Sequence, residues 1–198
     1  MAVKKTDRDQ VIDAALALFR VKGYHHTSMA DISAACGLLK GSIYHYFPGK
    51  KELAIATLDR VIGESREKIF AIAADETMTA ADRLRTLAEA VERYFIGKEG
   101  GCLIGNLALE VGDSVPEFGE RFRRYFDEWA EALTRLLGSR YREADARELA
   151  QDTIARVQGA IMMMGVNKDP SVLRRASRDV IALLEPALAS SLERELRA

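Results

Sequence analysis

Polar side chains are concentrated on one short segment near the start of the chain, LKGSIYHYF at residues 39–47. If this segment is a helix, Ile43 and Phe47 point inward. The residues left for its outer side include Lys40, Ser42, Tyr44, His45 and Tyr46. Hydroxyl, ammonium and aromatic groups of this kind can contact DNA phosphates and thymine methyl groups. The segment therefore predicts a helix that reads a major groove.

A second set of polar groups follows a glycine-rich break, in GGCLIGNLALEVGD at residues 100–113. Cys102, Asn106 and Glu110 are four residues apart, so they share one face of a helix. Two interpretations stay open for Asn106 and Glu110: they bind an effector in a pocket wall, or they bond internally, for instance from Glu110 to an arginine of the next helix. Two stay open for Cys102 as well. A thiolate at a helix start can be alkylated or oxidised, and the alternative is a packed, inert cysteine.

An aromatic stripe occurs later in the chain, where Phe122, Tyr125, Phe126 and Trp129 recur at spacings of three and four. Together with Met162 and its neighbours, this stripe predicts the roof of a hydrophobic ligand chamber. An ordinary packed core is the alternative interpretation.

Helical periodicity dominates the elements that position these groups, and it predicts an all-α fold of about nine helices with no convincing strand. The first helix ends at Gly23, Thr27 or Ser28 caps the second, and a turn at Gly37 precedes residues 39–47. Two short helices joined by a glycine turn, with a third helix before them, are typical of a helix-turn-helix.

The rest of the chain predicts longer helices. They are expected from Lys50 onwards and over residues 81–96, 102–111, 114–137, 143–165 and 170–195. The last of them has an apolar stripe from Leu173 to Leu188. We therefore divide the chain into a three-helix head at residues 1–51 and a helical body at residues 52–198.

Composition supports this division and limits the class of protein. The chain has 198 residues, of which 48% are apolar, so a sizeable core can form. Residues 1–51 hold 8 Lys and Arg against 4 Asp and Glu, whereas the net charge of the whole chain is -1. A basic head suggests a polyanionic partner, with chance as the alternative. No signal peptide or membrane span is apparent, so we expect a cytoplasmic protein without a membrane partner.

Patterns typical of enzymes are missing from the sequence. We find no phosphate loop, dinucleotide fingerprint or nucleophile elbow, and the body has no histidine. Two cysteines exclude a disulfide scaffold and a four-cysteine zinc site. His25 and His26, with Cys36 nearby, lack a recognised metal-ligand spacing. We therefore expect no enzyme activity, no cofactor and no metal. A helical interaction module without specific DNA binding is the alternative class.

The head resembles the TetR family of bacterial transcription regulators in the stretch GYHHTSMADISAACGLLKGSIYHYFPGKKEL, residues 23–53. The resemblance implies a homodimeric, ligand-responsive repressor that binds a palindromic operator and is released by a small-molecule or electrophile effector. Leu39 stands where the family usually has a small hydroxyl residue, so it either contacts a thymine methyl group or packs on a neighbour. The implied DNA contacts are Thr27, Ser28, Leu39, Lys40, Gly41, Ser42, Tyr44, His45, Tyr46, Lys50 and Lys51.

The same resemblance assigns roles in the body. The last two helices, residues 143–165 and 170–195, would form a four-helix dimer seam with the second subunit. The alternative is that their apolar stripes pack only within their own subunit. The opening Gly101-Cys102-Leu103 is similar to that of electrophile-responsive repressors of N-ethylmaleimide-reductase operons, whose sensing cysteine matches Cys102. With the polar and aromatic faces inferred above from the residue pattern, the candidate effector-binding residues are Cys102, Asn106, Glu110, Phe126, Trp129 and Met162.

Overall fold

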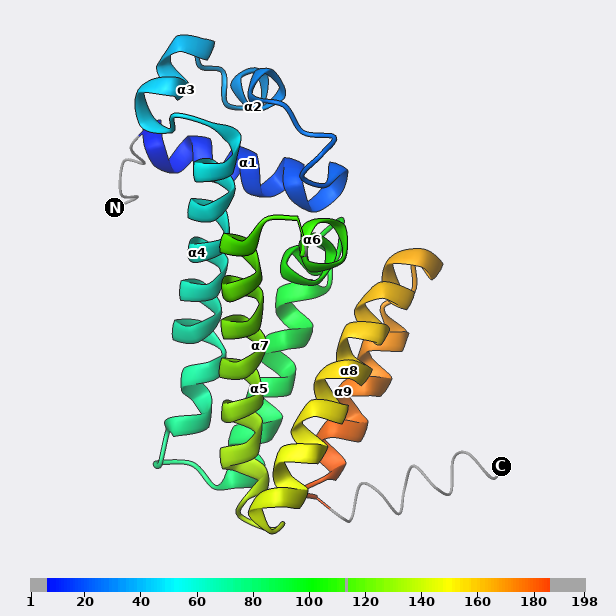
Figure 1. Ribbon diagram of the computed structural model, residues 1–198. Coiled ribbons are helices and arrows are strands. Elements are labelled where there is room, and N and C mark those ends of the chain that lie inside the picture. The colour runs from blue at the N-terminus through cyan, green and yellow to red at the C-terminus, as the bar shows by residue number, and fades with distance from the viewer. Residues whose placement is uncertain (1–6, 113, 186–198) are drawn as a thin grey trace. The chain divides into compact units, whose positions relative to one another are not determined.

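Helices and the turns that join them make up the described part of the protein (Figure 1). The computed structural model describes residues 7–112 and 114–185, and this part contains no strand and no helix long and apolar enough to cross a membrane. Its helices are α1 (Asp7–Lys22), α2 (Met29–Cys36), α3 (Lys40–Tyr46), α4 (Lys50–Lys68), the short 3-10 helix η1 (Phe70–Ala74), α5 (Ala80–Phe95), α6 (Leu103–Val111), α7 (Pro116–Leu137), α8 (Glu143–Asn167) and α9 (Ser171–Ala182). The predicted all-α fold is confirmed.

Local backbone preferences explain where the first helices begin and end. Gly23 (φ 81°) follows α1 and Gly37 (φ 68°) follows α2, both in the left-handed region that glycine adopts without steric cost. Ser28 starts α2 through a capping box, in which its hydroxyl accepts from the Asp31 amide and the Asp31 carboxylate accepts from the Ser28 amide. These are the residues at which the sequence predicts the helix boundaries.

The chain folds into two compact units. The first contains Met1–Gly63 and Glu99–Arg123, and the second contains Glu64–Lys98 and Arg124–Ala198. The first unit thus combines the three head helices with α6 and with the N-terminal parts of α4 and α7. The division predicted at residue 51 leaves α6 in the body, whereas the folded chain groups α6 with the head.

The core of the first unit forms around α1, which packs against α2, α3 and α6. A seven-residue helix such as α3 is too short to be stable alone, so its position depends on this packing. The fully buried apolar side chains of the unit include Val11, Ala15, Phe19, Ile32, Ile43, Leu53, Leu58, Leu107 and Phe118.

In the second unit, α9 packs against both α5 and α8. Aromatic side chains add to its core, because the Trp129 ring stacks on Phe70 with centroids 6.1 Å apart and Tyr125 meets Trp129 edge-on. Helix α9 ends at Ala182, earlier than the helix predicted to residue 195. Residues 186–195 of that prediction, with Ala187 and Leu188 of the predicted stripe, lie outside the described residues.

Candidate nucleic-acid interface

Helix α3 exposes one face and buries the other. Ile43 is fully buried and Phe47 nearly so, as predicted, and together they hold the helix against the head. Leu39 is 81% exposed and Tyr44 is 45% exposed. The other exposed residues of this stretch are Gly41, Ser42 and His45. The open face thus carries hydroxyl, imidazole and apolar groups of the kind that contact base edges and phosphates.

Leu39 and Tyr46 lie at the edges of this face. Leu39 is the N-cap of α3 and makes no side-chain capping bond. Because Leu39 is 81% exposed, described neighbours cover little of its side chain, and a base contact stays a prediction. Tyr46 is half-buried, and its ring meets that of His45 edge-on at 5.3 Å between centroids, so Tyr46 contributes partly to packing.

Polar side chains in the connection between α1 and α2 form hydrogen bonds with nearby residues of the same segment. Thr27 is buried, and its hydroxyl donates to the carbonyl oxygen of Gly23 at 2.7 Å. The expected phosphate contact of Thr27 therefore needs correction, because this hydroxyl stabilises the turn and does not reach the surface. Ser28 is exposed, and its hydroxyl donates to the Asp31 carboxylate at 2.6 Å.

The capping box of α2 makes stability depend on pH. Hydrogen bonds from the Ser28 hydroxyl and amide lower the pKa of the Asp31 carboxyl below its ordinary value of 3.8. A carboxyl whose pKa is lower in the folded state stabilises the fold above its unfolded pKa, and this stabilisation is lost as the pH falls through the folded pKa. We expect Asp31→Asn to have a lower Tm than the parent protein at pH 7. The difference in Tm between the two proteins should become smaller below about pH 4.

Thermal unfolding followed by circular dichroism from pH 7 to pH 3 measures this difference. The exposed Asp127, whose substitution by Asn makes the same change in charge, is the control. An equal narrowing in Asp127→Asn would show that the effect comes from net charge and not from the cap.

The two lysines at the start of α4 have partners inside the first unit. Lys50 Nζ donates to the Tyr24 carbonyl oxygen at 2.9 Å and lies 4.3 Å from the centroid of the Tyr24 ring. Lys51 Nζ lies 3.0 Å from Oε1 of Glu117, and this hydrogen bond raises the pKa of Lys51. Each ammonium group has three N–H donors, so a phosphate contact stays a prediction for both residues.

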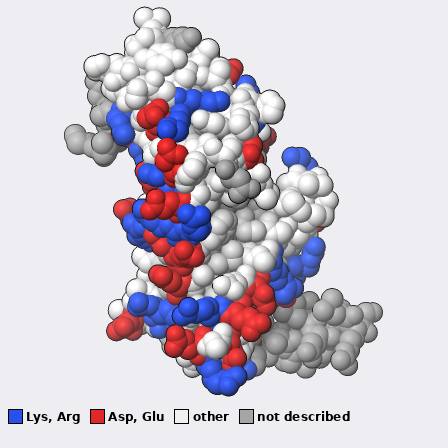
Figure 2. Space-filling view, in the orientation of Figure 1, with Lys and Arg blue, Asp and Glu red and all other residues white. Residues whose placement is uncertain are grey.

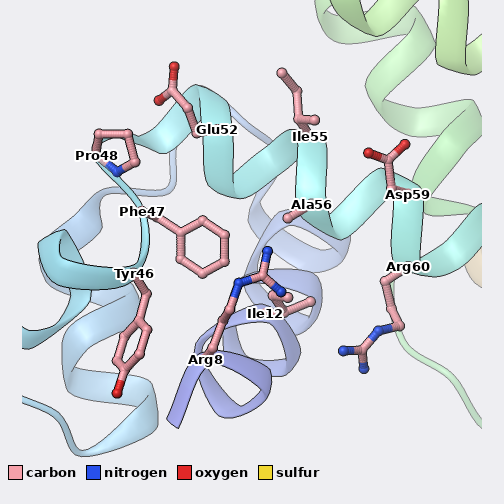
Figure 3. A pocket seen from close by; sticks show the side chains of 10 residues that line it. All are labelled: Arg8, Ile12, Tyr46, Phe47, Pro48, Glu52, Ile55, Ala56, Asp59 and Arg60. Carbon is pink, nitrogen blue, oxygen red and sulfur yellow. The ribbon is translucent and has the colours of Figure 1, made fainter. Parts of the chain in front are cut away.

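An open pocket of about 420 Å³ lies beside the end of α3 (Figure 3). The guanidinium carbon of Arg8 is 4.9 Å from the centroid of the Phe47 ring, and Arg60 of α4 pairs with Asp9 and Asp13 of α1. The pocket is lined by Arg8, Ile12, Tyr46, Phe47, Pro48, Glu52, Ile55, Ala56, Asp59 and Arg60. None of the predicted effector-binding residues is among them. The pocket is formed by α1, α4 and the residues at the end of α3.

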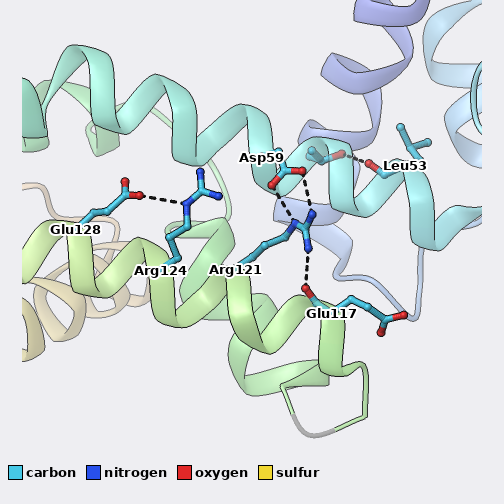
Figure 4. Close-up of polar contacts among 7 residues, drawn as sticks. Leu53, Asp59, Glu117, Arg121, Arg124 and Glu128 are labelled. Atoms are coloured by element: carbon cyan, nitrogen blue, oxygen red, sulfur yellow. Dashed lines mark hydrogen bonds and ion pairs between the residues drawn. The ribbon is translucent and has the colours of Figure 1, made fainter.

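Charges of both signs are interleaved on the face seen in Figure 2, and the end that carries α2 and α3 is mostly uncharged in this view. Ion pairs explain much of the interleaving. Arg121 binds both carboxylate oxygens of Asp59, at 2.9 and 3.2 Å, and donates to the carbonyl oxygen of Glu117 at 2.9 Å (Figure 4). The described Lys and Arg side chains of residues 7–51 do not form a uniformly basic face on this side.

Helix α6 has the predicted polar face. Residues of its first turn form hydrogen bonds with the glycine-rich segment before it. Cys102 is the buried N-cap, and its Sγ accepts from the Gly105 amide at 3.4 Å. The Asn106 side-chain amide donates to the Gly100 carbonyl oxygen at 2.5 Å. Gly100 (φ 80°) approaches α1 so closely that a Cβ there would lie 2.3 Å from the carbonyl oxygen of Arg20.

Glu110, at the other end of α6, bonds to the end of α1. Its carboxylate accepts from the Tyr24 amide at 2.8 Å and from the His25 amide at 2.7 Å. Of the two interpretations of Glu110, internal bonding is the one observed, with two backbone amides as partners in place of an arginine of the next helix. These contacts join residues 86 and 85 positions apart, and no local pattern in the sequence signals them.

The remaining effector candidates belong to the second unit. Trp129 is buried, and its indole nitrogen has no hydrogen-bond partner among the described residues. Phe126 is half-buried, whereas Met162 on α8 is 62% exposed. An open pocket of about 540 Å³ lies beside Phe70, but Phe126, Trp129 and Met162 do not line it. The predicted chamber thus stays a prediction.

Comparisons with known proteins match both parts of the chain. Residues 11–57 match the family described as "Bacterial regulatory proteins, tetR family", and residues 79–179 match "Transcriptional regulator LmrA/YxaF-like, C-terminal domain". The crystal structure of a TetR transcriptional regulator from Chloroflexus aurantiacus is 33% identical with a TM-score of 0.79, over 90% of this chain and 94% of that chain.

Two curated relatives are similar over nearly their whole length. The uncharacterized HTH-type transcriptional regulator YxaF of Bacillus subtilis is 27% identical, over 93% of this chain and 98% of YxaF. The HTH-type transcriptional repressor DhaR of Mycobacterium sp. strain GP1 is 25% identical, over 91% of this chain and 93% of DhaR.

Proposed function

The chain belongs to the TetR family of bacterial regulatory proteins, and we propose that it is a homodimeric repressor that binds a palindromic operator through α3 and leaves it when an effector binds. It is a helix-turn-helix transcriptional regulator and not an enzyme. The similarity to DhaR, which is named a repressor, supports repression over activation.

The exposed face of α3 carries the proposal. Ile43 and Phe47 anchor the helix inside the head, and the groups left outside are suited to base edges and phosphates. Leu39 and Tyr44 are large side chains exposed to solvent on a helix of only seven residues and its N-cap, which supports a role in contacting a partner. The proposed contacts are Ser28, Leu39, Lys40, Gly41, Ser42, Tyr44, His45, Tyr46, Lys50 and Lys51.

A second copy of the chain is the proposed partner of α8 and α9. Reading a palindrome requires two heads about one helical turn apart, roughly 34–36 Å along the duplex. Met163 and Val166 are exposed apolar residues of α8, at and directly after the end of residues 143–165, which supports burial of this helix against another surface. Residues 143–165 and 170–195 are the proposed seam.

A small molecule is the proposed effector, and the second unit supplies its apolar contacts through Phe126, Trp129 and Met162. The buried indole N–H of Trp129, which lacks a hydrogen-bond acceptor among the described residues, supports an effector that carries one. An electrophile acting at Cys102 is the second candidate. Cys102 is the N-cap of α6 and is only 5% exposed, so modification of its thiol requires a local opening.

Duplex selection tests the proposal. The protein enriches duplexes from a random-sequence library, and fluorescence anisotropy then compares the best duplex with a shuffled one across a salt series. We expect a specificity ratio of roughly a thousand or more. Equal and steeply salt-dependent binding to both duplexes would contradict specific recognition. The absence of binding to either would favour a helical interaction module.

Tyr44→Ala makes the test specific to α3. Because Tyr44 lies on the exposed face, we expect affinity for the selected duplex to fall by about 10- to 100-fold while the Tm changes little. Leu109→Ala is the matched control, since Leu109 is an apolar side chain on α6 that is 92% exposed. Equal losses in the two variants would show that α3 is not the recognition element.

A further inference from the structure

We infer that Glu110 is a positioning residue for operator binding: it ties α6 to the turn that leads into α2 and α3, and so sets where the recognition helix lies. The inference rests on the proposed function, because it assigns to α6 a role in DNA recognition at α3. Glu110 itself lies outside the exposed face of α3. Its effect on DNA would act through the backbone of the turn.

The geometry at the end of α1 is that of an anion site filled by the protein itself. Gly23 turns the chain with φ 81°, and the next two amides, of Tyr24 and His25, both donate to the Glu110 carboxylate. Successive amides after a left-handed residue form a nest that binds anions. The fit is close, since a Cβ at position 23 would lie 2.6 Å from Glu110 Oε2. Each carboxylate oxygen accepts from one amide, so both oxygens are needed.

Tyr24 is held from other sides as well. Its carbonyl oxygen accepts from Lys50 Nζ of α4, so one residue has its amide fixed by α6 and its carbonyl fixed by α4. Its ring packs edge-on against Phe118 of α7 at 5.4 Å and contacts Phe19 of α1 at 5.8 Å. Tyr24 is therefore the point at which α1, α4, α6 and α7 are joined within the first unit.

Hydrogen bonds before and after α2, together with α2 itself, link this point to α3. The Thr27 amide donates to the Tyr24 carbonyl oxygen at 3.3 Å, and Ser28 next to it caps α2. At the other end of α2, the Ser33 hydroxyl donates to the Leu38 carbonyl oxygen at 2.6 Å, immediately before the N-cap of α3. A displacement of α6 that carries Glu110 with it would therefore displace the turn and, through α2, the recognition helix.

Glu110→Gln tests this role with little change in shape. A glutamine offers one acceptor oxygen, so one of the two amides loses its partner. We expect affinity for the selected duplex to fall about tenfold, while binding to the shuffled duplex stays the same and the variant unfolds cooperatively. Hydrogen exchange of the Tyr24 or His25 amide should become faster. The control is Glu120→Gln, which makes the same charge change at an exposed residue of the same unit.

Gly23→Ala provides an independent second variant, because its Cβ displaces the carboxylate without removing its charge. If both changes act through the same contact, the double variant loses less affinity than the product of the two single losses. This double-mutant cycle also separates the contact from the cost of the positive φ at position 23, which is the same in both alanine variants.

The outcomes separate this inference from the proposed function. If the parent protein enriches a duplex and Glu110→Gln binds it as tightly as the parent does, the positioning role is overturned while the repressor proposal stands. Independent losses in the double-mutant cycle would overturn it too. If the parent protein enriches no duplex, the proposed function fails, and this inference fails with it. A merely stabilising role would lower the Tm and leave the ratio between the two duplexes unchanged.

Discussion

Gly100→Ala should be among the most destabilising single substitutions in the first unit, with a loss of about 2–5 kcal/mol in the free energy of unfolding. Two costs add. An alanine at φ 80° occupies the left-handed region, which costs about 1–2 kcal/mol. Its Cβ would also lie 2.3 Å from the Arg20 carbonyl oxygen, which belongs to the backbone of α1 and cannot rotate away. The loop or the helix must therefore shift, at a further cost of about 1–3 kcal/mol.

Gly97→Ala is the matched control, because Gly97 has a similar φ of 84° but a Cβ added there would meet no described heavy atom within 4 Å. We expect a loss of only about 1–2 kcal/mol for this variant. Urea unfolding monitored by circular dichroism gives both values. The difference between them measures the close approach between the loop before α6 and the end of α1. Equal losses would mean that the loop moves freely away from α1.

The second large effect is expected from Ile43→Ala on the recognition helix. Ile43 is fully buried, and truncation of a buried isoleucine to alanine typically costs about 2–5 kcal/mol. Helix α3 has seven residues and few other buried anchors, so this loss should loosen the helix and abolish the preference for the selected duplex.

Leu39→Ala tests base contact by this helix separately from the burial that holds the helix in place. Because Leu39 is 81% exposed, its truncation should change the free energy of unfolding by no more than about 0.5 kcal/mol. If Leu39 contacts a thymine methyl group, the variant should lose affinity for duplexes that carry that thymine and keep it for those that lack it. Duplex selection repeated with each variant measures the preference. If Leu39→Ala selects the same duplexes as the parent protein, Leu39 does not contact bases. If Ile43→Ala has the same free energy of unfolding as the parent protein, Ile43 does not anchor α3.

Much of the fold was predictable because its determinants are local. Gly23, Ser28 and Gly37 define the boundaries of the head helices through φ preference and capping, and both effects act within a few residues. The burial of Ile43 and Phe47 follows from helical periodicity in the same way. The candidate DNA-binding face could therefore be outlined from the sequence before any tertiary contact was known.

The contacts that the sequence does not predict depend on tertiary structure. Lys50 looks like a solvent-facing lysine at a helix start, yet it donates to Tyr24, which is 26 positions away. Thr27 looks like an exposed cap, yet its hydroxyl is buried in the turn. The grouping of α6 with the head has the same cause, since it depends on the packing of α6 against α1 and not on any property of its own sequence.

The bond between Glu110 and the amides of Tyr24 and His25 has a consequence for how related sequences can diverge. Its acceptor is a side chain, but its donors are main-chain atoms that every residue except proline supplies. Tyr24 and His25 can therefore be exchanged for many residue types without loss of these two donors. Gly23 and Glu110 do not have this freedom, since a larger residue at position 23 would collide with the carboxylate. We expect substitutions at these two positions to occur together during evolution, although the two residues lie far apart along the chain.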